Sequence, residues 1–480
     1  MIWKSLLSLG FLCHAYASLA ASPLPTATTD VVIVGGGSAG TYTAIRLQQL
    51  GKSVFVIEKE DVLGGHTNTF HVPGTSTTFD YGVISFANIS VVNEYFADMG
   101  VALGPFDVGV GGTTEYAKLN GGDATATTTV PPSVSWSNAT NVGLALEGYL
   151  AQSAKYAPFL TTGYDLPDPV PEELLMPWGA FARKHGIEAF DYTLFSLIQG
   201  SGNMLAQPAL YVLKYFSLFD VQILAGIQPG FLTTAAHNNH ALYDAALARL
   251  QAGANNSAVA LSSNVTRIVR SASSVSVSVS TPGGAKTVHA KQLVIAIPPT
   301  LPNLVSLGLD LTANERALSA QFNNSYYWDM VIAGTGIPDN LFIDAVDFAA
   351  PDAIPAQPGL YGIGSAGVDG LALAYFGSPH RMSDAQVKAE TVAALRRLAH
   401  ANGWDNGTFA PEFVGFHNHA PFLLTVDVGA VRNGFYRRLN ALQGVKNTWW
   451  TGAAWQTQDS SLIWNFTEAV VLPKVVESLR

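Results

Sequence analysis

A glycine-rich turn near the N-terminus constrains the fold of this chain more than any other feature. The turn runs from Gly35 to Gly40 with the spacing G-x-G-x-x-G. A β-branched run over 30–34 precedes it, and an apolar pattern with helical spacing over 38–50 follows it. A second apolar run over 53–57 completes a strand, a helix and a strand within about 30 residues. The sequence therefore predicts a right-handed βαβ unit of the Rossmann type, which is an α/β fold.

Five residues of this turn are predicted to bind the pyrophosphate of a dinucleotide. Gly35 permits the tight turn, Gly37 lets the pyrophosphate approach the backbone, and Gly40 lets the helix pack against the strand. The helix begins at Ser38 and Ala39, so its free N–H groups and positive dipole end face the phosphates.

A carboxylate follows at the position that binds a ribose. Glu58 lies 18 residues after Gly40, at the end of the second predicted strand. There it can accept hydrogen bonds from the ribose diol. The βαβ unit alone does not distinguish FAD from NAD.

Composition excludes some classes of function. The chain has 480 residues, of which 48% are hydrophobic and 12% are charged, and its net charge is -10. A chain of this length can form two or three domains around large cores. The negative net charge and the lack of a Lys/Arg stripe argue against a nucleic-acid partner.

The first residues are typical of a secretory signal peptide. Lys4 precedes an apolar stretch over 6–12, and small-x-small cleavage sites follow at Ala17 and Ala20. The stretch is shorter than the roughly 20 apolar residues that span a bilayer, and no later segment spans one. Residues 1–20 are predicted to be a signal peptide, and an uncleaved anchor is the alternative.

Two further features accompany this prediction of a secreted protein. The single cysteine, Cys13, lies inside the predicted signal, which excludes disulfides, thiol nucleophiles and Cys-ligated metals from the mature chain. N-glycosylation sequons occur at Asn88, Asn138, Asn255, Asn264, Asn323, Asn406 and Asn465. Some of these would arise by chance, so they support secretion and glycosylation only weakly.

A second motif follows Glu58 and resembles a known superfamily. The segment Gly64-Gly65-His66-Thr67 is similar to the Gly-Gly-Arg segment of the FAD-dependent amine oxidase and phytoene desaturase superfamily. The resemblance implies FAD, with Gly64, Gly65 and Thr67 along the pyrophosphate and His66 in place of the arginine.

Three later segments share this resemblance. Val265 matches a position whose backbone contacts the adenine, and the run over 293–299 resembles the strand that closes the FAD domain. Gly452 and Ala453 match the segment that meets the flavin, although Ile463-Trp464-Asn465 replaces the small residues usual further along.

A closer resemblance is to the fungal β-cyclopiazonate dehydrogenase family. It is carried by Gly-Gly-His-Thr together with the runs over 434–436, 442–444 and 448–455. The family comprises FAD enzymes of secondary metabolism that remove a hydride equivalent and often promote oxidative ring closure.

The chain is expected to divide into interleaved segments. Aromatic-rich helical patterns dominate the segment before residue 250, and strand patterns return after it. We expect a FAD-binding domain formed by 30–92, 251–309 and 432–480, interrupted by a largely helical substrate lobe over 93–250 and a substrate-binding domain over 310–431. The inserted part is expected to be α+β.

A second glycine string, over 362–367, is not predicted to bind NADPH. No adequate strand precedes it, and Gly370 interrupts any helix after it, so a hairpin is expected. The reduced flavin would then be reoxidised by dioxygen or another external acceptor.

His66 has two interpretations. Its ring could hydrogen-bond a phosphate or a backbone carbonyl, or it could be linked covalently to the flavin. Retention of the yellow colour by acid-precipitated protein would distinguish the two.

Four other side chains are candidates for the active site. His417 and His419 share one strand face and could supply a base, whereas no third ligand is spaced for a metal. Lys214 could hold a water near the flavin, or extend to the surface. Trp464 could line the flavin pocket, or fill the core.

The sequence thus predicts a secreted FAD-dependent oxidoreductase that transfers a hydride from a small organic substrate, with an imidazole such as that of His419 as the base. One alternative is a secreted amine or amino-acid oxidase that releases an imine and hydrogen peroxide. Another is a flavoprotein that binds a ligand without turnover.

Overall fold

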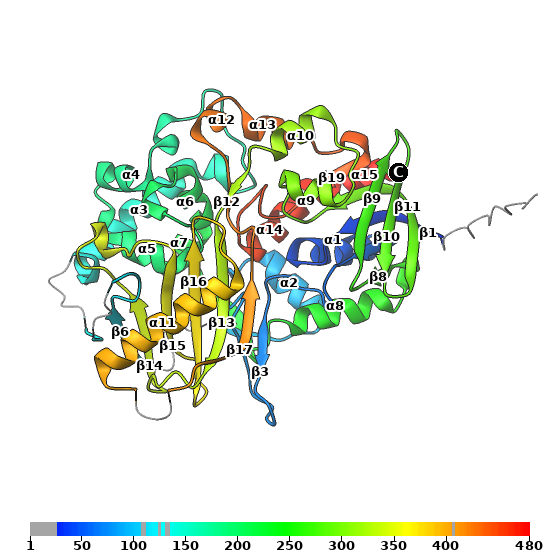
Figure 1. The fold of residues 1–480 in the computed structure, drawn as a ribbon. Coiled ribbons are helices and arrows are strands. Elements are labelled where there is room, and N and C mark those ends of the chain that lie inside the picture. The colour runs from blue at the N-terminus through cyan, green and yellow to red at the C-terminus, as the bar shows by residue number, and fades with distance from the viewer. Residues whose placement is uncertain (1–25, 107–111, 123–125, 130–134, 406–408) are drawn as a thin grey trace, which may run out of the picture.

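The computed structural model describes residues 26–106, 112–122, 126–129, 135–405 and 409–480 (Figure 1). The predicted signal peptide, Cys13 and the sequon at Asn406 lie outside these ranges. Among the described residues, no helix combines the length and the apolar character needed to cross a membrane.

The first sheet contains the predicted βαβ unit. β1 pairs in parallel with β2 on one side and with β11 on the other. The strand order is β8-β2-β1-β11-β10-β9, and β19 pairs in parallel with the end of β11. Its strands are β1 (Thr26–Val34), β2 (Val54–Ile57), β8 (Ala258–Ala260), β9 (Asn264–Arg270), β10 (Val275–Thr281), β11 (Gly284–Ile295) and β19 (Thr448–Trp450).

One strand of this sheet corrects the sequence-based assignment. From the sequence we expect a hairpin strand over 287–290 and a separate buried strand over 291–297, but residues 287–295 belong to the single strand β11. Its first half pairs antiparallel with β10, while β1 pairs with it from Thr287 to Ile295. No turn residue separates the two runs, so the strand continues through both.

Helices cover the first sheet on the side of the glycine turn. α1 packs against β1 and β2, and α8, α14 and α15 pack against α1. The helices near this sheet are α1 (Ser38–Gln49), α2 (Ser90–Met99), α8 (Ala241–Gln251), α9 (Leu301–Ser306), α10 (Ala313–Ser319), α14 (Ser460–Phe466) and α15 (Leu472–Ser478). A π-helical turn joins the last two, within the segment expected to form the terminal helix.

The second sheet is mostly antiparallel, with the strand order β17-β13-β16-β15-β14-β6. Helix α11 (Asp384–Asn402) crosses one of its faces (Figure 1). Its strands are β6 (Thr113–Ala117), β13 (Tyr326–Ala333), β14 (Leu341–Ala345), β15 (Gly359–Ser365), β16 (Leu371–Ser378) and β17 (Glu412–Asn418). The β15–β16 hairpin includes the second glycine string, as expected.

The remaining elements form a helical cluster and three short strand pairs. The cluster contains α3 (Ala139–Leu160), α4 (Trp178–His185), α5 (Asp191–Leu197), α6 (Ala209–Tyr215) and α7 (Leu218–Leu224), and α12 (Val428–Arg432) and α13 (Phe435–Asn440) lie above it in Figure 1. The pairs are β3 (Thr69–His71) with β4 (Thr78–Asp80), β5 (Leu103–Pro105) with β7 (Leu232–Thr234), and β12 (Asn323–Asn324) with β18 (Leu424–Thr425).

The observed architecture is an α/β fold with a Rossmann-type unit and an inserted α+β part, as the sequence predicts. The segment 93–250 contacts both sheets, because β6 is a strand of the second sheet and α8 packs against α1 and β8 beside the first. This segment is therefore less separate from the sheets than its helical pattern indicates.

Candidate cofactor-binding and active site

The glycine turn has the geometry that its sequence predicts. Gly35 has a φ of +100°, and its N–H donates to the carbonyl of Ile57 at the end of β2. A Cβ on Gly40 would lie 1.9 Å from the carbonyl oxygen of Gly35, so α1 can begin here only with glycine at that position. Close helix–strand packing is thus the role of Gly40.

A second glycine pair lies directly against this turn. The N–H of Gly64 donates to the carbonyl of Gly36 at 2.9 Å, and Gly37 forms a β-bridge with Gly64. A Cβ on Gly65 would lie 3.1 Å from the Cα of Gly37. Two stretches of bare backbone therefore meet at the start of α1, which favours the close approach of a pyrophosphate.

Glu58 is placed beside this bare backbone. Its carboxylate accepts the N–H of Gly36 at 2.6 Å and the N–H of Glu60 at 2.9 Å. The carbonyl of Glu58 accepts the N–H of Ser263, two residues before Val265. The structure thus brings the predicted ribose-binding acid and the predicted adenine-binding segment together.

A polar cluster lies at the other side of the turn. The hydroxyl of Ser38 donates to that of Ser460 at 2.9 Å, and the hydroxyl of Tyr243 lies near both serines and near Thr67. The Thr67 and Tyr243 hydroxyls are buried and have no hydrogen-bond partner among the described residues. Because buried hydroxyls usually have hydrogen-bond partners, these two fit contacts to a bound cofactor.

The C-terminal segment that contains Gly452 and Ala453 also lies beside the start of α1. Gly452 has a φ of +107°, and a Cβ there would lie 3.9 Å from the Cβ of Ala39. Ala453 follows and is half-buried against the core. Bare backbone at Gly37 and Gly65, the Glu58 carboxylate and the unpartnered hydroxyls lie in one place, which we call the cofactor cradle, and these residues fit FAD. The predicted cofactor contacts line or adjoin this cradle.

His66 joins this cradle to the second sheet. Its ring lies edge-on to that of His419, with the ring centroids 4.4 Å apart, and nearly parallel to that of Phe422. The rings of His417 and His419 are nearly parallel, with their centroids 6.3 Å apart, in line with their predicted common strand face. Three imidazoles therefore meet between the two sheets.

His419 is paired with a buried acid. Its Nε2 lies 2.6 Å from Oδ2 of Asp329 on β13, and both side chains are almost inaccessible to solvent. Burial lowers the pKa of His419 to about 3 and raises the pKa of Asp329 well above its usual range. Burial also lowers the pKa of His66, and the neighbouring His419 lowers it further. Burial thus favours neutral imidazoles here.

Comparison with known proteins identifies the family. The model for the NAD(P)-binding Rossmann-like domain matches residues 33–99. The chain is 36% identical over 460 residues to the FAD-dependent oxidoreductase oblC of Cochliobolus heterostrophus, which covers 94% of this chain and 92% of that protein. It is 32% identical to the β-cyclopiazonate dehydrogenase of Aspergillus oryzae, over 96% of this chain and 97% of that protein. The chain belongs to the β-cyclopiazonate dehydrogenase family of FAD-dependent oxidoreductases.

Solved structures agree on the fold. A fatty acid isomerase from P. acnes that produces CLA has a TM-score of 0.71 and 18% identity, and the match covers 93% of this chain and 98% of the isomerase. A putrescine oxidase redesigned in its cofactor binding has a TM-score of 0.63 and 17% identity, with 94% and 100% covered. The predicted family and fold are confirmed, and the prediction of an FAD-dependent oxidoreductase is confirmed with them.

In this family member, Lys214 has a structural environment that revises its predicted role. Its ammonium group donates to the carbonyls of Leu160 and Gly163 and to the side-chain oxygen of Gln456. The side chain is 1% exposed, so it does not extend to the surface either. Three acceptors use its three N–H groups, which leaves none for a water beside the flavin. Lys214 instead ties the turn after α3 to the C-terminal segment.

Trp464 lies in an aromatic cluster rather than on the side of His419. Its ring is fully buried against those of Tyr42, Tyr95, Phe86 and Phe96. Its indole N–H donates to the carbonyl of Ser38 at 3.2 Å. This arrangement favours a role in holding the start of α1, and it does not support the catalytic role considered from the sequence.

Several residues of the site were missed by the sequence analysis. Asp329 lies within an apolar strand, and Tyr243 and Ser460 lie on helices with no motif of their own. A single acid in the middle of an otherwise apolar strand was the one available signal for Asp329, because buried acids require a partner. Tyr243 and Ser460 can be assigned to the site only from the structure, in which their helices pack around the glycine turn.

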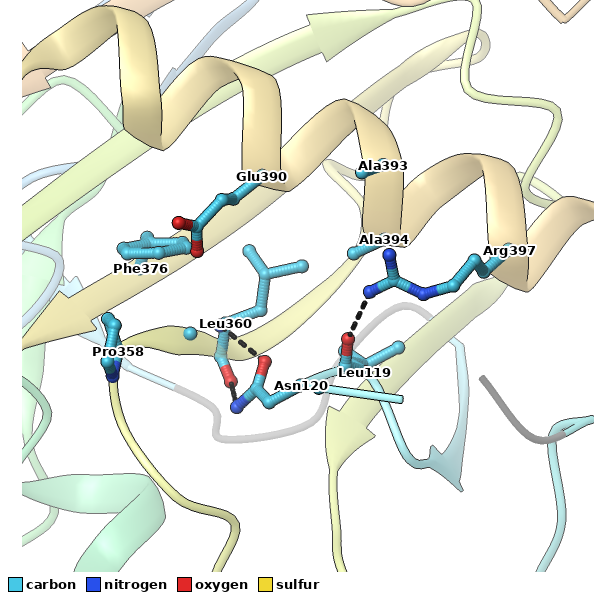
Figure 2. A pocket seen from close by; sticks show the side chains of 11 residues that line it. Leu119, Asn120, Pro358, Leu360, Phe376, Glu390, Ala393, Ala394 and Arg397 are labelled. Atoms are coloured by element: carbon cyan, nitrogen blue, oxygen red, sulfur yellow. Dashed lines mark hydrogen bonds between the residues drawn. The ribbon is translucent and has the colours of Figure 1, made fainter. Parts of the chain in front are cut away.

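A cavity of about 230 Å³ lies elsewhere, between α11 and the second sheet (Figure 2). Asn120 borders it and is fixed by two hydrogen bonds to the backbone of Leu360, while Arg397 donates to the carbonyl of Leu119. None of the predicted site residues lines it, and it is smaller than the usual ligand pocket of about 300 Å³ or more. We therefore assign no part of the active site to it.

The glycine cradle gives a testable prediction. In Gly37→Ala, the new Cβ would lie 3.8 Å from its nearest neighbour and φ is -69°, so the apoprotein should fold with nearly unchanged stability. The methyl group would occupy space that the pyrophosphate needs, so we expect at least tenfold weaker FAD binding, about 1.4 kcal/mol. Titration of apoprotein with FAD, followed by flavin fluorescence, measures this.

The matched control is Gly143→Ala in α3, where a Cβ meets no atom within 4 Å. This control should bind FAD as the wild type does. Equal FAD affinity in Gly37→Ala and the wild type would contradict the cradle.

Proposed function

We propose that this protein uses FAD to remove a hydride equivalent from a small organic molecule of the secondary-metabolite type, with oxidative ring closure as one outcome. The observation that carries this proposal is the contact between His66 beside the cofactor cradle and the buried His419–Asp329 pair on the second sheet. It places a proton-binding group next to the residues that would hold FAD. The family membership adds support, since relatives named β-cyclopiazonate dehydrogenase are similar over nearly the whole chain.

The residues divide the work between binding and proton transfer. FAD, when bound, would supply a two-electron acceptor for the hydride that leaves the substrate carbon. The glycine backbones, Glu58 and the unpartnered hydroxyls would hold the cofactor. His419 would take the proton that leaves a neighbouring O–H or N–H of the substrate on its Nδ1, because its Nε2 is engaged by Asp329.

Loss of a hydride and a proton leaves an electrophilic double bond in the substrate. A nucleophile in the same molecule would close a ring on it if the pocket holds the two ends together. The aromatic rings of Tyr327 and Phe422, whose centroids are 5.0 Å apart beside His419 and His66, would provide an apolar wall for this purpose. Dioxygen or another external acceptor would then take the electrons from the protein.

Turnover provides the decisive test of this function. Under anaerobic conditions, a substrate of the proposed class should reduce the flavin and bleach the visible absorbance of the yellow holoprotein. Admission of air should restore the colour. Bleaching by simple amines with release of peroxide would instead favour an amine oxidase. If no candidate metabolite of this class bleaches the colour, the proposed substrate class is wrong.

We propose that FAD is held without a covalent bond and that His66 contacts it. The ring of His66 already packs against His419 and Phe422, and the cradle offers backbone, carboxylate and hydroxyl partners for the cofactor. Acid precipitation should therefore release all the yellow colour into the supernatant. Colour that stays in the pellet of the wild type but is lost in His66→Ala would establish a covalent link instead.

We propose that the protein enters the secretory pathway and is N-glycosylated. The predicted signal over 1–20 supports this, as does the exposure of the sequon residues Asn255, Asn264 and Asn323 in the structure. Expression of the full chain in a fungal host should place it in the medium, with a lower mass after endoglycosidase treatment. Intracellular protein of unmodified mass would contradict the proposal.

A further inference from the structure

We propose that Asp329 is the positioning residue for His419, and that the two side chains bind and release protons as one buried unit. This inference rests on the proposed function, in which His419 faces the substrate. It adds a residue that neither the motifs nor the family name assigns.

The geometry fixes the orientation of the His419 ring. Asp329 lies in the middle of β13, with β16 and β17 paired on its two sides at Tyr375 and His417. The carboxylate is therefore held by a central strand, and its Oδ2 lies 2.6 Å from Nε2 of His419. With Nε2 engaged, Nδ1 is the ring nitrogen left for exchange with a substrate.

The second oxygen of Asp329 bears on the net charge of the pair. Oδ1 is buried and has no hydrogen-bond partner among the described residues. An ionised carboxylate with one oxygen unsatisfied in the core is costly unless it binds a proton or a cation. This oxygen therefore indicates that the pair carries no net charge in the resting state.

Within the described part of the chain, neither Asp329 nor His419 has a hydrogen bond or ion pair with an ammonium or guanidinium group. Every titratable group that faces the pair from the packed elements is an imidazole, a phenol or a more distant charge. The imidazoles are those of His66, on the loop after β2, and His417, on β17. The phenols are those of Tyr81 after β4, Tyr327 on β13 and Tyr375 on β16. The more distant charges are those of Lys59 and Glu60, which act on the histidines from the same loop as His66. None of them neutralises a carboxylate as a salt bridge would.

The consequence is a unit that holds two protons between the two residues at low pH. Burial raises the pKa of Asp329, so the neutral pair persists above the usual range of a carboxyl group. Loss of one proton leaves the carboxylate facing Nε2–H and frees Nδ1 as a base. Because the basic form appears only above the raised pKa, kcat/KM should increase with pH through that value.

A change that keeps the shape of Asp329 but removes its titration tests the unit. In Asp329→Asn, the amide can hold the ring but cannot release a proton. We expect kcat/KM to fall on the order of 10²-fold, as for loss of a positioned acid–base group. The rise of kcat/KM with pH should also disappear from the range in which the wild type shows it.

Asp191→Asn is the matched control. Asp191 is also fully buried, its Oδ1 accepts a single hydrogen bond from the indole of Trp178 at 2.7 Å, and its Oδ2 has no partner among the described residues. Burial raises its pKa to about 8. It lies on α5 in the helical cluster, so this variant should keep the pH profile of the wild type.

A second measurement does not depend on turnover. In protein labelled with ¹⁵N-histidine, the signals lost in His419→Gln identify the His419 ring. In the wild-type holoprotein, Nδ1 should lose its proton at the same pH at which kcat/KM rises. In Asp329→Asn, that titration should be absent over the same range.

The outcomes separate the two proposals. If the wild type shows no flavin-dependent turnover, the proposed function fails, and the ¹⁵N titration still decides whether Asp329 and His419 act as one unit. An unchanged pH profile and an unchanged His419 titration in Asp329→Asn would overturn the inference, whatever the loss of rate. An equal shift of the profile in Asp191→Asn would overturn it as well.

Discussion

The contact between two stretches of glycine backbone, at Gly37 and Gly65, is the constraint on which the site depends. Neither position tolerates a side chain without closing the surface that the two backbones form together. Glu58 adds a hydrogen bond from its carboxylate to the N–H of Gly36, and so connects the end of β2 to the start of α1. The hydrogen bond between Glu58 and Gly36 therefore stabilises the βαβ unit and also shapes the surface that would bind the cofactor.

The second sheet contributes the side chains that we propose for proton transfer. Backbone amides and the Glu58 carboxylate can hold a cofactor, whereas the paired side chains of His419 and Asp329 could exchange a proton with a substrate. The imidazoles of His66, His417 and His419 meet where the two sheets face each other, and Asp329 fixes one of them from a central strand. Cofactor binding thus depends on backbone geometry, whereas proton transfer would depend on side chains whose protonation is governed by burial.

The sequence predicts best those elements of the fold that are determined by residues close together in the chain. The glycine turn, the strands around it and the β15–β16 hairpin follow from residue types at fixed spacing, and the structure has them in the expected places. The division of β11 was wrong, because apolar alternation does not show where a strand changes its partner. Lys214 was misplaced for a related reason, and of the two interpretations of Trp464 the structure favours the one in which it fills the core. A lysine or tryptophan on a helix gives the same sequence pattern whether it faces a ligand, a carbonyl or the core. Only the folded structure shows that Lys214 donates to Gln456 and that Trp464 donates to Ser38.

This separation bears on how members of one family can act on different molecules. A cradle made of bare backbone depends on a few glycines and one acid, so the surrounding side chains can change without loss of the cofactor. Groups on β13 and β17, in contrast, act through their own side chains, and each substitution there alters shape or charge beside the substrate. Relatives with distinct names share 32% to 36% identity with this chain over nearly its whole length. In this chain, we therefore expect substitutions on β13 and β17 to change the choice of substrate, while the Gly37–Gly65 contact keeps FAD in place.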